Sequence, residues 1–345
     1  MRTQWYVGAA LLAVVAAVLV VVWQDRPLRA ADDPNAPAVT LSGPYVHKNL
    51  AVYLIHGSDR IKEKEFLTLA EALEQKKAVV AETGEVERLT VENLSTVPIY
   101  VHAGAIVKGG KQDRMVKDDY LVPPKTKISV YTFCVESGRW RARGSEKATE
   151  FSSNTNTVAT KELKLAARSS QQQGEVWKEV GNAQTKLSSN VGGDVRSKDS
   201  ASSLQLTLED QKVKDSTEEY RKALADIVKD KKDVVGYAFA INGKINSTDV
   251  YGAKALFLKL WPQLLEATAV EAVANLQKDQ KYTAPDKDAV RTFMEDSRKA
   301  KPTEREVTKD SVLLLRDSKK SVNLTTVDKS QPQAAPVREN VISKE

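Results

Sequence analysis

The chain has 345 residues, of which 41% are hydrophobic and 28% charged, enough for one large domain or two small ones with a sizeable core. Its formal net charge of +6 is small for this length and gives no reason to expect nucleic-acid binding. The single cysteine, Cys134, excludes an intramolecular disulfide, and three scattered histidines argue against a zinc site. We expect neither a metal nor a cofactor.

The N-terminus carries an uncharged apolar run at residues 5–23, with Trp5 and Trp23 at its two ends. As a helix this run would span roughly 28 Å, close to the thickness of a bilayer core, and tryptophans suit both membrane interfaces. A cleaved signal peptide usually has a shorter apolar core, so we favour a single-pass transmembrane anchor over a signal peptide. The membrane is then one partner, and we expect the bulk of the chain on the periplasmic or extracellular side.

Prolines between residues 30 and 44 indicate a tether. Beyond it, residues 50–55 form an apolar run typical of a strand. Residues 65–75 have helical spacing, and Thr68 with Glu71 could form a capping box that starts this helix as late as Thr68. The run at 86–93 alternates polar and apolar residues, which predicts a half-buried strand.

The stretch from 98 to 140 reads as a meander of short strands joined by turns, with a glycine pair at Gly109 and Gly110. Its strongest strand covers residues 127–135. Both faces of that strand are mostly apolar, so we predict that it is central and covered on both sides.

The second half alternates between polar segments and amphipathic ones. We predict a long loop at 141–170 and a helix at 171–187. The segment 234–250 predicts a hairpin, because the dipeptide at 242–243 is Asn-Gly, which fits a type I′ turn. The helix that follows contains Pro262, which predicts a kink or two short helices.

Together these elements predict an α+β fold, a mostly antiparallel sheet or sandwich covered by helices from the second half and preceded by one N-terminal transmembrane helix. Residues beyond about 280 are charged and lose periodicity, which indicates disorder. The predicted segments are an N-terminal tail at 1–4, the anchor at 5–23, a linker at 24–42, an α+β domain at 43–280, and a largely disordered tail at 281–345.

Several motifs follow one another in the order seen in a known family. They read GGKQDR at 109–114, CVESGRW at 134–140, a helix with Trp177, GY at 236–237, NGK at 242–244 and an aromatic-rich helix at 251–261. In these motifs the chain resembles the ARG and rhodanese-phosphatase-superfamily-associated protein domain family, an uncharacterised bacterial family, over roughly residues 43–276. The resemblance implies a gene neighbourhood of ADP-ribosylglycohydrolases and rhodanese-type phosphatases, and it carries over no catalytic residue.

Two of these motifs supply the candidate ligand-binding residues Gln112, Asp113, Arg114, Glu136 and Arg139. If their strands pair, Arg114 and Arg139 would form an anion clamp that Asp113 and Glu136 orient. The competing interpretation is structural. In that case Glu136 forms a buried ion pair with one of the arginines, and Trp140 stacks on a guanidinium. Cys134 lies between apolar neighbours, which favours an inert buried thiol over a nucleophile.

No nucleophile–base pair is evident, so whether the protein is an enzyme stays open. Our leading hypothesis is an exported, membrane-anchored binding domain at the bacterial envelope, with an anionic small molecule or a protein as its partner. The first alternative is a hydrolase of a phosphorylated or ADP-ribosylated substrate, with Asp113 or Glu136 as acid or base. The second alternative is a purely structural envelope protein, which would lack a concave polar pocket.

Overall fold

The structure is a computed structural model that describes residues 39–61, 64–169, 172–330 and 334–345. These residues belong to one compact unit, Asn35–Glu345. The predicted anchor at 5–23, the tail at 1–4 and most of the linker lie outside them. Among the helices that the structure describes, none is long and apolar enough to cross a membrane. The fold is α+β with mostly antiparallel strands, so this part of the prediction is confirmed.

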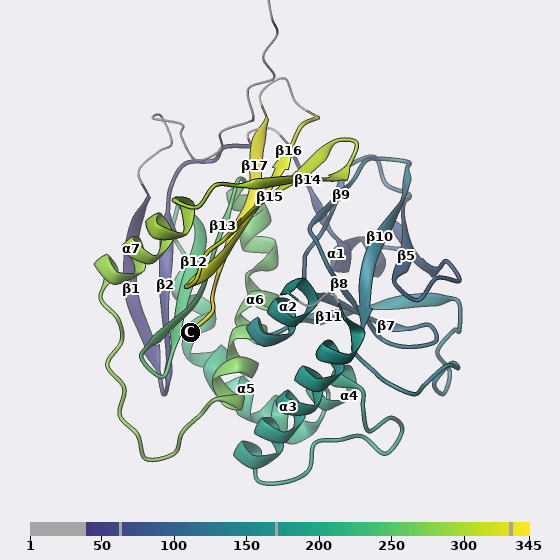
Figure 1. Cartoon of the computed structure of the whole chain (residues 1–345), viewed down its shortest axis with the longest axis horizontal. Coiled ribbons are helices and arrows are strands. Elements are labelled where there is room, and N and C mark those ends of the chain that lie inside the picture. The colour runs from purple at the N-terminus through teal and green to yellow at the C-terminus, as the bar shows by residue number, and fades with distance from the viewer. Residues whose placement is uncertain (1–38, 62–63, 170–171, 331–333) are drawn as a thin grey trace, which may run out of the picture. The chain divides into compact units, whose positions relative to one another are not determined.

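Eight strands form one antiparallel sheet in the order β1-β2-β12-β13-β17-β16-β15-β14 (Figure 1). The colours of Figure 1 show that they come from the beginning, the middle and the end of the described chain. The strands are β1 Thr40–His47, β2 Leu50–His56, β12 Val234–Ile241, β13 Lys244–Tyr251, β14 Thr303–Thr308, β15 Ser311–Asp317, β16 Ser321–Asp328 and β17 Ala335–Ser343.

The hairpin β12–β13 joins the first part of this sheet to the last. All eight residues of β12 are buried. At the turn, Asn242 and Gly243 have φ angles of 53° and 76°, the two positive values that a type I′ turn requires. The predicted hairpin is therefore confirmed.

The first half of the chain forms a closed barrel in the order β10-β5-β4-β11-β7-β8, beside a small sheet β3-β6-β9. Apolar side chains such as Leu89, Val107 and Phe151 belong to one buried cluster in this part. The barrel strands are β4 Ala78–Glu82, β5 Arg88–Asn93, β7 Ala105–Gly109, β8 Arg114–Val116, β10 Lys127–Cys134 and β11 Glu150–Val158. The small sheet contains β3 Leu67–Thr68, β6 Ile99–Val101 and β9 Tyr120–Val122.

Strand β10 pairs on both sides, with β5 and with β8, as expected for a central strand. The prediction that both its faces are covered is wrong for the first half, where Lys127, Ser129 and Tyr131 are exposed. The reason is that only one face of a barrel strand points into the barrel core, while the other meets solvent. Here Arg88 covers part of that outer face, with its guanidinium 4.0 Å from the centre of the Tyr131 ring.

The helices include α6, which packs against the barrel strand β11 and the sheet strand β12. Pro262 lies inside α6, yet the helix is continuous, so the predicted alternative of two short helices is wrong. Burial of apolar side chains on all sides of α6 outweighs the cost of about 3 kcal/mol for an internal proline. The helices are α1 Leu69–Glu74, α2 Lys161–Ser169, α3 Gln173–Val191, α4 Leu204–Leu208, α5 Gln211–Leu224, α6 Lys254–Ala274 and α7 Lys287–Arg298, with a 3₁₀ turn η1 at Ala225–Val228. The capping box of Thr68 and Glu71 begins α1, as predicted.

Two sequence predictions failed because burial came from distant partners. The segment 281–345, predicted as a largely disordered tail, contains α7 and half of the eight-stranded sheet. Every residue of β16 is buried, although five of its eight residues are polar or charged. The predicted loop at 141–170 likewise contains β11 and α2. β17 pairs with the distant β13, and β16, β15 and β14 extend the sheet from it, so the domain extends well beyond residue 280.

A buried charge cluster joins the large sheet to the barrel side. Arg338 of β17 donates to Asp249 of β13, with Nε 2.6 Å from Oδ1, and to Asp119, with Nη1 3.1 Å from Oδ1. Asp119 lies between β8 and β9, and it also accepts hydrogen bonds from Tyr100 and from Thr326. These side chains, all buried, thus connect β6, β13, β16 and β17.

Replacing Arg338 by methionine should lower the free energy of unfolding by about 3–5 kcal/mol, because two buried carboxylates lose their partner. Urea denaturation followed by circular dichroism measures this change. As a control, Arg291→Met removes an exposed ion pair with Asp288 and should cost less than about 1 kcal/mol. Similar costs for the two variants would mean that the buried cluster does not hold the units of structure together.

Candidate functional site

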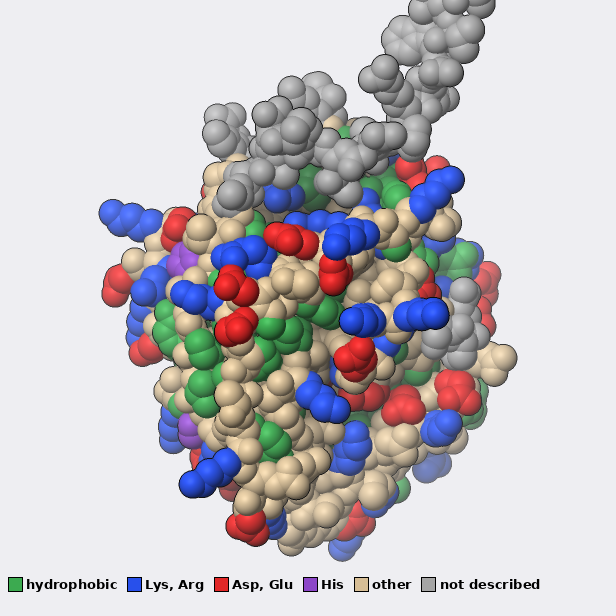
Figure 2. Space-filling view, turned by 60° about the vertical axis from the view of Figure 1, so that its left-hand side comes forward, with side chains coloured by type: hydrophobic (Ala, Val, Ile, Leu, Met, Phe, Trp, Pro, Cys, Tyr) green, Lys and Arg blue, Asp and Glu red, His purple; other side chains and the backbone are tan. Residues whose placement is uncertain are grey.

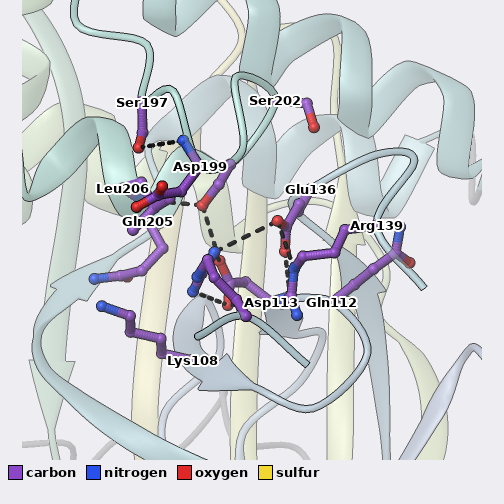
Figure 3. A network of polar contacts seen from close by, with 12 residues as sticks. Lys108, Gln112, Asp113, Glu136, Arg139, Ser197, Asp199, Ser202, Gln205 and Leu206 are labelled. Carbon is purple, nitrogen blue, oxygen red and sulfur yellow. Dashed lines mark hydrogen bonds and ion pairs between the residues drawn. The ribbon is translucent and has the colours of Figure 1, made fainter. Parts of the chain in front are cut away.

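The five predicted ligand-binding residues lie around the junction of β8 and β10. Gln112 and Asp113 are in the turn between β7 and β8, Arg114 begins β8, and Glu136 and Arg139 follow β10. Arg114 pairs with Cys134 across the two strands, which brings the turn beside the end of β10. The side chains of Asp113, Glu136 and Arg139 meet there, as Figure 3 shows.

Direct contacts join the two motifs. The backbone amide of Asp113 donates to Glu136 Oε2 at 3.0 Å, and Arg139 Nε donates to Glu136 Oε1 at 2.7 Å. Arg139 Nη2 lies 3.6 Å from Asp113 Oδ1. Both carboxylates are fully buried, and the guanidinium is 8% exposed. The two motifs therefore form one buried ion network.

Sequence reasoning missed a second cation, Arg143. It lies 3.1 Å from Asp113 Oδ1, 3.4 Å from Glu136 Oε1 and 2.9 Å from Glu146 Oε1. Ser203, the N-cap of α4, donates to Asp113 Oδ2 at 2.8 Å. Both residues come from polar stretches without periodicity, so no local signal marks them.

The remaining donors of Arg139 point to the backbone rather than to open space. Its Nη1 donates to the carbonyls of Gly110 and Arg141, and its Nη2 to the carbonyl of Gly109. The amide of Gly109 donates to Asp113 Oδ1 at 3.0 Å, and that of Gly110 to Glu150 O at 3.2 Å. The backbone amides of Gly109 and Gly110 therefore donate to acceptors within the protein.

Arg114 has a different environment from Arg139. Its Nη1 donates to the carbonyl of Gln112 at 3.0 Å, and its Nη2 lies 3.8 Å from Glu82. Arg114 is 1% exposed, and Gln112 is fully buried. The two guanidinium groups therefore have separate carboxylate partners, and ligand binding by the predicted residues stays a prediction.

Residues 38–331 match the family described as ARG and Rhodanese-Phosphatase-superfamily-associated Protein domain. The chain belongs to this family. The match covers well over half of the sequence and includes both motifs of the buried network. No curated protein and no solved structure matches the chain.

In this family member, the network holds its charges in fixed protonation states. Burial opposes ionisation of Glu136, but hydrogen bonds from Arg139 and from the Asp113 amide outweigh it, so the pKa of Glu136 lies below its ordinary value. Burial raises the pKa of Cys134 to about 11, which keeps this fully buried thiol neutral. The predicted inert cysteine is consistent with these observations.

Trp140 and His102 also have environments unlike an active site. Trp140 is 55% exposed, and no guanidinium stacks on it in the described part of the chain, so its predicted stacking is wrong. His102 is buried and lies 3.0 Å from the Tyr251 hydroxyl. Burial and the nearby Arg338 hold the pKa of His102 well below its ordinary value. Among the described residues, no three histidine, cysteine or acidic side chains gather as a metal site.

The variant Glu136→Gln should lower the free energy of unfolding by about 2–4 kcal/mol at pH 7, because Arg139 and Arg143 lose a buried partner charge. The ion pair stabilises the fold above the unfolded-state pKa of 4.5, and that contribution is lost as pH falls through the lower folded-state pKa. The gap between variant and wild type should therefore close in acid. Urea titrations at several pH values test this.

The matched control is Glu150→Gln, which removes an exposed pair with Lys147 from the same barrel. We expect a change below about 1 kcal/mol. If Glu136→Gln were as stable as the wild type at pH 7, the network would not brace the barrel.

Proposed function

We propose that this protein is a membrane-anchored binding domain that recognises an amphipathic organic anion in a groove beside α7. The groove has a volume of about 780 Å³, within the range of small-molecule sites. It lies where the β12–β13 turn, α7, the β15–β16 turn and the end of β17 come together. This groove is the observation that carries the proposal, and it argues against a purely structural envelope protein.

The lining of the groove combines apolar surface with positive charge. Ile245, Pro285, Ala289 and Phe293 supply the apolar part. The lining also contains four lysines against two acidic residues, and the lysines are Lys244, Lys299, Lys319 and Lys320. In Figure 2, the side of the molecule that bears α7 and β1 comes forward and shows hydrophobic side chains bordered by basic and acidic ones. An anion with an apolar tail fits this combination.

Two of the four lysines have ammonium groups that are not paired with a carboxylate of the described residues and can attract an anionic ligand. Lys299 is paired with Asp296 at 2.6 Å. The pKa of Asp296 is lowered first by this hydrogen bond and further by the charges of Lys299 and Lys320, which reports a positive field. Lys244 and Lys319 form no ion pair with any residue that the structure describes.

The five buried residues around Glu136 have a different role in this proposal. Because Arg139 already donates to the Glu136 carboxylate and to the carbonyls of Gly109 and Gly110, we assign these residues the bracing of the barrel rather than ligand capture. The same contacts disfavour a hydrolase with Glu136 as its acid, since a lowered pKa leaves no proton to donate near neutral pH. The family description, which associates the domain with other proteins, supports an interaction role.

The double variant Lys244→Glu/Lys319→Glu should weaken binding of a dansyl-labelled fatty acid about tenfold, equivalent to about 1.4 kcal/mol, because the carboxylate loses two attractive charges. Fluorescence titration gives the dissociation constants. Lys178→Glu/Lys222→Glu carries the same charge change at exposed sites outside the groove and should change the constant less than about twofold.

Equal losses of affinity in the two double variants would mean that only the net charge matters, and would contradict binding in the groove. Displacement of the label by an acidic peptide but not by unlabelled fatty acid would assign the groove to polypeptides instead. The variant Phe293→Ser adds an independent check, since it removes apolar surface without changing charge.

The anchor has its own test, because residues 5–23 lie outside the described residues. In a bacterial host, the full chain should stay in the membrane pellet after a carbonate wash, while a variant lacking 5–23 should become soluble. Protease added to spheroplasts should digest the domain if the bulk of the chain is exported. A full chain that the carbonate wash releases would exclude a transmembrane anchor.

A further inference from the structure

A serine, a histidine and an aspartate form a hydrogen-bonded chain at the edge of the large sheet, away from the groove and the buried network. Ser42 Oγ lies 2.7 Å from His56 Nε2, and His56 Nδ1 lies 2.8 Å from Asp233 Oδ1. We propose that Ser42, His56 and Asp233 are the nucleophile, base and orienting acid of a hydrolytic site for small carboxylic esters. This activity goes beyond the proposed binding function.

Strand pairing explains why three distant residues meet. Ser42 lies in β1, His56 ends β2, and Asp233 directly precedes β12. Both neighbouring strands meet β2 at His56, which pairs with Thr40 of β1 and with Val234 of β12. The β1 register shifts directly after Ser42, at Gly43, whose φ is 100°. A side chain at Gly43 would lie 2.8 Å from the Val52 carbonyl, so the bulge needs glycine.

The contacts match the order that nucleophilic catalysis requires. In the neutral tautomer that carries its proton on Nδ1, His56 donates to Asp233 and presents its Nε2 lone pair to the hydroxyl of Ser42. The hydrogen bond from His56 lowers the pKa of Asp233, so this carboxylate is ionised at neutral pH. The His56 side chain is 13% exposed and that of Asp233 62%, so solvent reaches these two members of the hydrogen-bonded chain.

A pocket of about 420 Å³ opens beside this chain, and His56 and Asp233 both line it. Ser42 is partly buried and does not itself line the pocket, but its hydroxyl contacts His56, which does. Ser58 and Asp59 line the same pocket, and their backbone amides donate to no acceptor in the described part of the chain. Free amides are the kind of donor that stabilises an oxyanion.

The chemical steps balance without a cofactor. Ser42 Oγ attacks the ester carbonyl while its proton passes to His56 Nε2. The C–O bond to the leaving alcohol then breaks, and the alcohol takes that proton. Water attacks the acyl-serine with His56 again as base, which releases the carboxylic acid and restores Ser42.

A fluorophosphonate ester tests the proposal, because it traps an activated serine. Ser42 Oγ would bond to phosphorus as the P–F bond breaks and fluoride leaves. With the full chain in detergent, mass spectrometry should find one adduct per chain on the Ser42 peptide. His56→Gln should slow labelling about a hundredfold, and Asp233→Asn about tenfold, less than for a buried triad because Asp233 is exposed.

Ser189→Ala is the control, an exposed serine of α3 that does not line this pocket, and it should label at the wild-type rate. Circular dichroism of each variant checks its folding. The adduct site on the wild-type chain answers the question even where a variant unfolds. No adduct, an adduct on a different serine, or a Ser42 adduct whose rate does not depend on His56 would overturn the proposal.

Discussion

The pairing of Arg338 with two carboxylates is the constraint on which the rest of the structure depends. A buried guanidinium requires partner charges, and they come from different units, Asp249 from the large sheet and Asp119 from the segment between β8 and β9. Burial would raise the pKa of Asp119, but the charge of Arg338 outweighs it and keeps this carboxylate ionised. This pairing fixes the barrel, the small sheet and the large sheet in one arrangement. The groove beside α7 and the pocket at His56 lie at the two ends of β12 in that arrangement.

The polar groups of this protein fall into two kinds with different consequences for function. The networks around Arg338 and Glu136 are buried, and the Nε groups of Arg338 and Arg139 donate to carboxylates within the chain. Such networks fix one arrangement of the backbone and leave little for a ligand to bind. The lysines beside α7 and the chain at His56 are open to solvent instead. They flank β12 at its two ends, since Asp233 precedes this strand and Lys244 follows its turn. We therefore assign ligand binding and catalysis to the two ends of β12, and stability to the buried networks around Arg338 and Glu136.

Local patterns predicted elements well where the signal is complete within a few residues. The Asn-Gly turn, the capping box at Thr68 and the alternation in β5 all depend on neighbours in sequence. The approach of GGKQDR to CVESGRW could also be predicted, because each motif lies at the end of a strand that the sequence predicts. Arg143 and Ser203 were not, since they reach the network from segments without a periodic pattern. The contact of Ser42 with His56 was inaccessible for another reason, as it depends on the register of β1 against β2.

The α+β class, the family and the charge-bearing turns could be predicted from the residues alone, because these depend on short-range spacing and on side-chain types. The structure of residues 281–345 depended on the packing of the whole domain. These residues become α7 and four strands because β13 supplies hydrogen bonds to β17, and Asp249 and Asp119 pair with Arg338. The tertiary structure also decided which charges are buried and which face solvent, since burial is a property of elements packed together rather than of the residues within any one of them.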